Sequence, residues 1–306
     1  MNSSFGNATF LAMESLDRQT LFDLKAALAA RAESELESSA AFCRVLDLVK
    51  TRLQAGMRAI LLSLEFEGKC PLSIEDLSIF TPILANALGD LLVQNEKGDK
   101  VIYVYDRDRL GSMYDGARYH QTREGGTIHT DNVNIPKPWD YLLFSCLAAG
   151  EAGGESILVD GVAVHQCLKD SFPRALKTLE EKFYWEMRGV ADSLYQAPII
   201  TYDQKGLPLF RHLRPYMESA HRKAGVSLTL EQLYAVDVLD ALTNSLRFQT
   251  HYSMRQGDHL ISVDSQVLHG RTCFSDSLDS VTIDEYLKGT GKKLKRTMER
   301  VWLTKK

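Results

Sequence analysis

The sequence predicts a mainly β fold with inserted helices (α+β), in which a double-sheet jelly roll or barrel follows a set of N-terminal helices. From about residue 100 onward, short β-patterned runs alternate with helical segments, whereas the first 60 residues have apolar side chains at helical spacing. No GxGxxG or P-loop motif follows any of these strands. Doubly wound nucleotide-binding folds are therefore disfavoured.

Residues 1–100 are expected to form a mostly helical N-terminal part. Apolar residues recur at helical intervals in SLDRQTLFDLKAALAARAES (15–34) and in ESSAAFCRVLDLVKTRLQAG (37–56). The run MRAILLSLEFEG (57–68) is typical of a buried strand. Ser73 is then predicted to cap a helix, because acidic side chains follow it in the first turn, where the helix dipole favours them.

Residues 100–304 are expected to form the β core with helical insertions. Strands are predicted in VIYVYDRD (101–108), GGTIHTDN (125–132), DYLLFSCLAA (140–149), GGESILVDG (153–161) and, as a closing strand, RTMERVWL (296–303). Two hairpins are predicted over 198–210 and 246–270, and the second of them turns at Gln256-Gly257-Asp258. Helices are predicted at about 161–171, 174–183 and 229–244. Because the chain has no repeat or low-complexity linker, residues 1–306 are expected to form a single domain.

Composition indicates a cytoplasmic protein that binds neither nucleic acid nor membrane. The net charge of −4 and pI of about 6.1 give no reason to expect nucleic acid or an anionic membrane as a partner. The apolar runs are shorter than a bilayer requires, and the N-terminus lacks the pattern of a signal peptide. Five scattered cysteines without a CxxC motif favour reduced thiols over disulfides or a zinc framework.

His129 and Asp131 are the starting point for a metal site. On a strand, residues two apart share a face, so both side chains could reach one ion. About one such His-x-acid pair is expected by chance in a chain with 8 histidines and 40 acidic residues, so the pair needs a further ligand. His269 is the best candidate, at the end of the strand predicted within DHLISVDSQVLHGRTCF (258–274). Two histidines and one carboxylate form the facial triad that binds Fe(II) in non-haem oxygenases.

Four segments together resemble the taurine dioxygenase family, and within it the clavaminate-synthase-like branch of iron(II)/2-oxoglutarate oxygenases. They are, in the family's order, HTD (129–131), GGESILVDG (153–161), GDHLISVDSQVLHGRTCF (257–274) and RTMERVWL (296–303). The resemblance implies a double-stranded β-helix (jelly-roll) core. It also implies that His129, Asp131 and His269 are the catalytic iron ligands, with Fe(II) as cofactor, 2-oxoglutarate as cosubstrate and O₂ as oxidant.

The same resemblance implies that Ser156 and Arg296 bind 2-oxoglutarate. A hydroxyl can donate to its carboxylate, and a guanidinium can pair with that carboxylate in a bidentate manner. Arg296 follows His269 by 27 positions, a longer spacing than is usual in the family, and the intervening residues 275–293 are typical of an inserted loop with a short helix. This departure leaves Arg271 as a rival anchor. Arg300 lies four positions after Arg296, on the same strand face, and is expected to bind a substrate carboxylate or to share the cosubstrate.

Polar residues on either side of the HxD pair predict the substrate site. Besides Arg300, the candidate contacts are Arg118, Tyr119, Gln121, Arg123, Asn132 and Asn134. Their density of polar and cationic groups indicates a small polar metabolite with a carboxylate or amide, such as an amino acid or a peptide-derived natural product.

The expected reaction is hydroxylation of an unactivated C–H bond, with succinate and CO₂ as coproducts. Desaturation and epoxidation use the same ligands and remain alternatives. A cupin-like metal hydrolase or isomerase could use the same His-Asp-His set, and a metal-free binding protein could retain the fold. The hydrolase or isomerase does not account for Ser156 and Arg296, because those residues have no role in binding metal.

Overall fold

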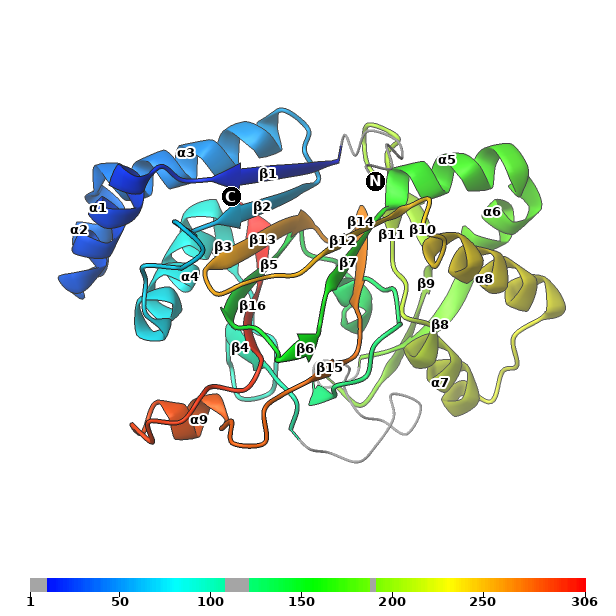
Figure 1. The fold of residues 1–306 in the computed structure, drawn as a ribbon. Coiled ribbons are helices and arrows are strands. Elements are labelled where there is room, and N and C mark those ends of the chain that lie inside the picture. The colour runs from blue at the N-terminus through cyan, green and yellow to red at the C-terminus, as the bar shows by residue number, and fades with distance from the viewer. Residues whose placement is uncertain (1–9, 108–120, 188–190) are drawn as a thin grey trace.

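A seven-stranded sheet is the larger of two facing sheets in the structure, a computed structural model that describes residues 10–107, 121–187 and 191–306 (Figure 1). In spatial order its strands are β1 (Leu11–Ser15), β2 (Ala59–Ser63), β13 (Asp258–Val263), β5 (Tyr141–Ala148), β16 (Thr297–Lys305) and β3 (Gly89–Leu91), with β4 (Val101–Val104) also paired to β16. The β1–β2 pair is parallel and the other pairs are antiparallel. The N-terminal part therefore forms strands of this sheet in addition to its helices.

The second sheet has three antiparallel strands, in the order β12 (Gln249–Tyr252), β7 (Ser156–Asp160) and β14 (Val267–Arg271). The two sheets pack face to face through one buried apolar cluster. Leu158 and Val267 of the small sheet belong to the same cluster as Leu61 and Leu260 of the large sheet. The space between the sheets is where the functional site lies.

Four N-terminal helices cover the outer face of the large sheet: α1 (Arg18–Ala29), α2 (Glu33–Ser38), α3 (Ala40–Gln54) and α4 (Ile74–Leu88) (Figure 1). Leu24, Phe42 and Phe80 of these helices pack with sheet residues such as Ile261 and Val301 in the largest apolar cluster. This layer shields the back of the strands from water and thereby holds the strands of the site in register.

A second group of helices covers the small sheet and contains α5 (Gly161–Ser171), α6 (Pro173–Leu179), α7 (Arg214–Ala224) and α8 (Leu230–Thr243) (Figure 1). Short paired strands lie among them and at the rim, namely β8 (Lys182–Glu186) with β9 (Leu194–Pro198), β10 (Ile200–Tyr202) with β11 (Pro208–Phe210), and β6 (Ala152–Gly153) with β15 (Phe274–Ser275). The short helix α9 (Ile283–Tyr286) precedes β16. None of the helices in the described ranges is long and apolar enough to cross a membrane.

Several predicted elements are confirmed. Helix α4 is capped by Ser73, as predicted: the Ser73 hydroxyl accepts the Asp76 N–H, and the Asp76 carboxylate accepts the Ser73 N–H. The helices α5 and α8, the β10–β11 hairpin and the closing strand β16 also lie where the pattern predicts them. The inserted segment 275–293 contains the short helix α9.

Other predictions are wrong, because tertiary pairing decided them. Residues 11–15 form strand β1 and not a helix, because they extend the large sheet alongside β2. The helix predicted over 174–183 ends at Leu179, and the chain continues into β8. Helix α7 is not predicted at all, since its segment RPYMESAHRKA has few apolar side chains from which a period could be read.

The region 246–270 does not form the predicted hairpin. Strand β12 pairs with β7 in the small sheet, whereas β13 pairs with β2 and β5 in the large sheet, so residues 253–257 carry the chain from one sheet to the other. A further turn at 264–266 separates β13 from β14, so that His269 lies within β14. The predicted strand GGTIHTDN is reduced to a single β-bridge between His129 and His269, and a 3-10 helix, η3 (Asp131–Asn134), follows it.

Candidate active site

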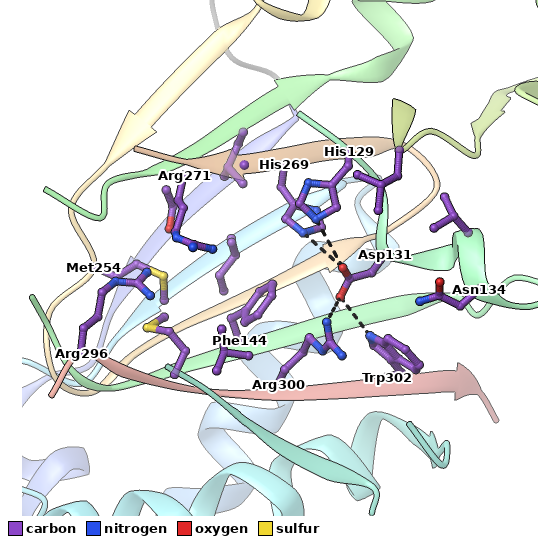
Figure 2. Close-up of a pocket in the computed structure, with 18 of the residues that line it drawn as sticks. His129, Asp131, Asn134, Phe144, Met254, His269, Arg271, Arg296, Arg300 and Trp302 are labelled. Carbon is purple, nitrogen blue, oxygen red and sulfur yellow. Dashed lines mark hydrogen bonds and ion pairs between the residues drawn. The ribbon is translucent and has the colours of Figure 1, made fainter. Parts of the chain in front are cut away.

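A pocket lies between the two sheets and contains both halves of the predicted metal site (Figure 2). Its walls come from β4, β5, β13 and β16 of the large sheet and from β7 and β14 of the small sheet, with the N-terminal end of α7 and the segment 129–134 completing it. Phe144, Leu158, Leu260 and Met298 make much of this wall apolar. The pocket thus offers a mostly apolar enclosure with polar groups at selected points, as small-molecule sites usually do.

The structure brings His129, Asp131 and His269 together. One potential ligand atom from each residue lies within 4.8 Å of the others, and no other group of His, Cys, Asp or Glu in the described part of the chain is arranged to hold a metal. The Nε2 atoms of His129 and His269 lie 3.5 and 3.9 Å from Asp131 Oδ1. Two backbone hydrogen bonds of 2.8 and 2.7 Å join His129 to His269 in an isolated β-bridge. This bridge stands in place of the strand that the sequence predicts over residues 125–132.

The protonation states of these residues suit a metal ligand set. Burial alone would raise the pKa of Asp131. The Arg300 guanidinium and the two imidazoles lower it by more than burial raises it, so the pKa of Asp131 lies well below its usual range. Burial and the neighbouring His129 lower the pKa of His269 to about 3. His129 donates its Nδ1–H to the Thr127 carbonyl at 3.0 Å, and its Nε2 faces Asp131 Oδ1 at 3.5 Å. An anionic carboxylate and neutral imidazole nitrogens are the forms that bind metal.

The two oxygens of Asp131 have different surroundings. Oδ1 faces the two histidines, whereas Oδ2 accepts hydrogen bonds from Arg300 Nη1 at 2.9 Å and from Trp302 Nε1 at 3.1 Å (Figure 2). The Trp302 ring stacks on Trp139 with centroids 3.9 Å apart. Since the second oxygen is already occupied by two donors, Asp131 presents one oxygen to the space between the imidazoles.

Gln94 holds Arg300 in place and was not predicted from the sequence. Its Oε1 accepts from Arg300 Nε at 2.9 Å, and its Nε2 donates to the Arg300 carbonyl at 2.8 Å. The side chain of Gln94 is fully buried. A lone glutamine between loop residues gives no sequence signal of this role, because the contact spans 206 positions along the chain.

The predicted cosubstrate residues lie together at one end of the pocket, where Figure 2 shows Arg271 and Arg296 on the side away from Asn134 and Trp302. Ser156 opens strand β7 and is paired in register with Arg271. Both guanidinium groups lie over the Phe274 ring, with the Cζ atom 4.8 Å from the ring centroid for Arg296 and 5.3 Å for Arg271. The end of the pocket is therefore strongly cationic and buried, which suits a carboxylate.

The chain approaches Arg296 closely at Gly154. A Cβ atom at this position would lie 2.7 Å from Arg296 Nε, and the φ of +75° also disfavours any other residue. The inserted segment supports the same arginine, because the Asp276 carboxylate accepts the Arg296 N–H at 2.7 Å. The longer spacing between His269 and Arg296 is thus compatible with a buried Arg296 that lines the pocket.

The predicted substrate residues are divided by the structure. Asn134 lines the pocket, and its Oδ1 is buried without a hydrogen-bond partner in the described structure. Arg300 also lines the pocket, but its guanidinium is engaged by Asp131 and Gln94. Asn132 does not line the pocket, because its amide accepts from Thr130 and donates to the Phe210 carbonyl within the fold.

The predicted substrate residues before the HxD pair do not line the pocket where the structure describes them. Arg123 pairs with Asp106 at 3.0 Å, with 62% of its side chain exposed. Gln121 accepts the Arg107 N–H through its backbone carbonyl and does not line the pocket. Arg118 and Tyr119 lie outside the described residues.

The residues present fit a divalent metal ion. Two imidazole nitrogens and one carboxylate oxygen converge in a buried pocket, and this donor set is typical of non-haem iron. The buried arginines at one end of the pocket provide the charge that a dicarboxylate cosubstrate requires.

Comparisons with known proteins agree with this geometry. The family model "Taurine catabolism dioxygenase TauD, TfdA family" matches residues 62–298. FR-33289 synthase of Streptomyces rubellomurinus (strain ATCC 31215) is 25% identical over 219 residues, which are 69% of this chain. The match spans only 62% of the length of that relative.

Two solved structures share the fold. An asparagine oxygenase in complex with Fe(II), 2S,3S-3-hydroxyasparagine and succinate is similar with a TM-score of 0.66, 15% identity and coverage of 96% of this chain and 93% of that one. The non-heme iron oxygenase OrfP in complex with Fe and alpha-ketoglutaric acid has a TM-score of 0.66 and 14% identity, and the match covers 95% and 94% of the two chains. At these identities the likeness concerns the fold, a mixed arrangement of helices around a large sheet.

The family match extends over more than half of the chain and includes both segments that meet in the pocket. It confirms the predicted family, which is a family of dioxygenases, and the described residues contain a His-Asp-His group that could hold a metal ion. The chain belongs to the taurine catabolism dioxygenase TauD, TfdA family.

Proposed function

We propose that this protein hydroxylates an unactivated C–H bond of a small polar metabolite, an amino acid or a peptide-derived natural product, and releases succinate and CO₂. The main support is the convergence of His129, Asp131 and His269 in a buried pocket that has two arginines at one end. A dicarboxylate cosubstrate explains the arginines, and a redox metal explains the triad.

In this proposal His129 Nε2, Asp131 Oδ1 and His269 Nε2 hold Fe(II). When bound, the iron and 2-oxoglutarate would activate O₂, which is the oxidant for C–H hydroxylation. Arg300 and Trp302 keep Asp131 Oδ2 hydrogen-bonded, so that the carboxylate keeps one orientation. Arg296 and Ser156 bind the 2-oxoglutarate carboxylate, and the buried setting of Arg296 strengthens this pairing because water competes less for it.

The substrate would occupy the end of the pocket near Asn134. The buried Asn134 Oδ1 is an acceptor for an N–H group, and the Arg300 guanidinium is the nearby candidate for a carboxylate. The hydroxyasparagine bound to the asparagine oxygenase and the hydroxy-L-Arg bound to OrfP support an amino-acid-like substrate. The roles of Arg118 and Tyr119 remain predictions from the sequence.

We also infer that the two facing sheets form a double-stranded β-helix and that residues 1–306 fold as one domain. Strands β1, β2 and β3 from the first 100 residues flank β13, β5 and β16 on both sides within the large sheet, which supports a single domain. Neither part could bury its apolar face alone.

The test is 2-oxoglutarate turnover under defined conditions. Anaerobic addition of Fe(II) and 2-oxoglutarate should produce a weak visible charge-transfer band, which a hydrolase would not show. With air, succinate release should increase with some members of a panel of free amino acids and cyclic dipeptides, and the product should gain one oxygen atom. A product that loses two hydrogen atoms would indicate desaturation instead. Absence of the band with purified protein would refute the proposal.

A further inference from the structure

The two histidines of the metal site differ in the support of their outer ring nitrogen. His129 Nδ1 has a partner, the Thr127 carbonyl, at 3.0 Å. His269 Nδ1 is buried and has no hydrogen-bond partner in the described structure. A carboxylate oxygen, Oδ1 of Asp264, lies 4.0 Å from it.

Asp264 already supports the other half of the site. Its Oδ1 accepts the Asp131 N–H at 3.1 Å, and its Oδ2 accepts the Asn132 N–H at 3.0 Å. The residue is fully buried in the turn between β13 and β14, five positions before His269. The Asp264 carboxyl group therefore binds the backbone at Asp131 and also faces the imidazole ring of His269.

We propose that Asp264 is a positioning residue of the metal centre, which orients His269 through its Nδ1–H and fixes the Asp131 segment through two backbone N–H groups. This inference rests on the proposed metal site. It concerns a residue that does not touch the metal and that has no part in the proposed ligand set.

The chemistry of a ligand imidazole explains why an acceptor is needed. When Nε2 gives its lone pair to a metal, the proton resides on Nδ1. A buried N–H without an acceptor is unfavourable, because it has lost its hydrogen bond to water and gained none. An approach of about 1 Å would bring His269 Nδ1 and Asp264 Oδ1 to the usual distance of an N–H···O hydrogen bond, about 2.9 Å.

The geometry also explains why the acceptor is a carboxylate. A carboxyl group has two oxygens, and each can accept more than one hydrogen bond, so Asp264 can accept two backbone N–H groups and an imidazole N–H together. An asparagine has only one acceptor oxygen and would have to give up at least one of these bonds. Asp264→Asn is therefore the informative variant, since it preserves the shape of the side chain and removes one of its two acceptor oxygens.

Asp160→Asn is the matched control. Asp160 Oδ1 accepts the N–H groups of Val162 and Ala163 at 3.1 and 3.3 Å, so it supports a helix start in the same way. Asp160 is not among the residues that line the pocket. Both variants should lose stability, but only Asp264→Asn should lose metal affinity.

The experiment measures Mn(II) binding to the purified full-length protein, with Mn(II) as a redox-stable probe, alongside urea unfolding of the metal-free protein. We expect Asp264→Asn to weaken Mn(II) binding about 10–100-fold, the usual effect of removing an outer-shell partner of a ligand, and Asp160→Asn to leave it unchanged. Equal Mn(II) affinity of Asp264→Asn and wild type would overturn the inference while the metal site stands. If the wild type itself binds no Mn(II), the proposed function fails and the inference fails with it.

A second measurement needs no variant and remains available if Asp264→Asn does not fold. In the Zn(II)-loaded wild type, nitrogen-15 NMR should show His269 protonated at Nδ1, with a proton protected from exchange with water. A His269 Nδ1 that binds the metal itself, or whose proton exchanges as fast as that of an exposed imidazole, would contradict the inference.

Discussion

Replacement of Glu299 by glutamine should stabilise the protein at alkaline pH and leave it unchanged at acidic pH. Glu299 lies on β16, on the face that packs against α4, and only 1% of it is exposed. Burial raises the pKa of Glu299 from 4.5 to about 7, although the hydroxyls of Thr81 and Ser78 lower it in part. The folded protein therefore holds a proton here that the unfolded chain has already released.

The sign and size of the effect follow from this difference. A raised pKa in the folded state means that stability is fully present below pH 4.5 and is lost as the pH rises through about 7. Each pKa unit corresponds to about 1.4 kcal/mol, so the wild type should lose about 3 kcal/mol from this group by pH 8. Glutamine resembles the protonated acid and does not titrate. Glu299→Gln should thus be more stable than the wild type by up to about 3 kcal/mol at pH 8 and equal to it at pH 4.5.

Urea unfolding at the two pH values, followed by tryptophan fluorescence, measures this difference. The comparison of variant and wild type at each pH cancels every other titrating group. Glu151→Gln, which neutralises an exposed carboxylate, is the control and should change stability by at most about 0.5 kcal/mol at both pH values. The reasoning is refuted if the difference between Glu299→Gln and wild type is the same at both pH values.

Four further outcomes are expected. Burial lowers the pKa of His259 from 6.5 to about 4, so stability should be lost as the pH falls through this window, and His259→Gln should reduce the loss in acid unfolding curves; an unchanged acid limb would contradict this. Arg296→Lys should raise the KM for 2-oxoglutarate about 10–100-fold in succinate-release assays, because the bidentate pairing is lost, whereas a KM equal to that of the wild type would point to Arg271 instead. His129→Ala should abolish both the metal-induced rise in Tm and turnover, and retention of either would exclude His129 as a ligand. Gln94→Leu should weaken Mn(II) binding through Arg300 and Asp131 while the KM for 2-oxoglutarate stays constant, and a matching rise in that KM would indicate a general collapse of the pocket.

The sequence was informative wherever the chemistry is local. The HxD pair, the distal His269 and the closing strand are short motifs, and the structure brings their side chains into one pocket. Helix caps such as Ser73 are local as well, since the cap and its partner are three residues apart. Alternation of apolar and polar residues likewise located β12 and β13 as strands.

Pairing between distant segments was decided only in the tertiary structure. A period of two in the sequence indicates that β12 and β13 are strands but does not identify the strands they pair with. The sequence therefore predicted a hairpin where the chain in fact crosses from one sheet to the other. The same applies to Gln94, Trp302 and Asp264, whose hydrogen bonds to the site span 206, 171 and 133 positions. Ligand types can be read from the sequence because each is a single residue with characteristic chemistry. The groups that orient those ligands cannot, because any donor or acceptor that the fold brings within reach can perform that task.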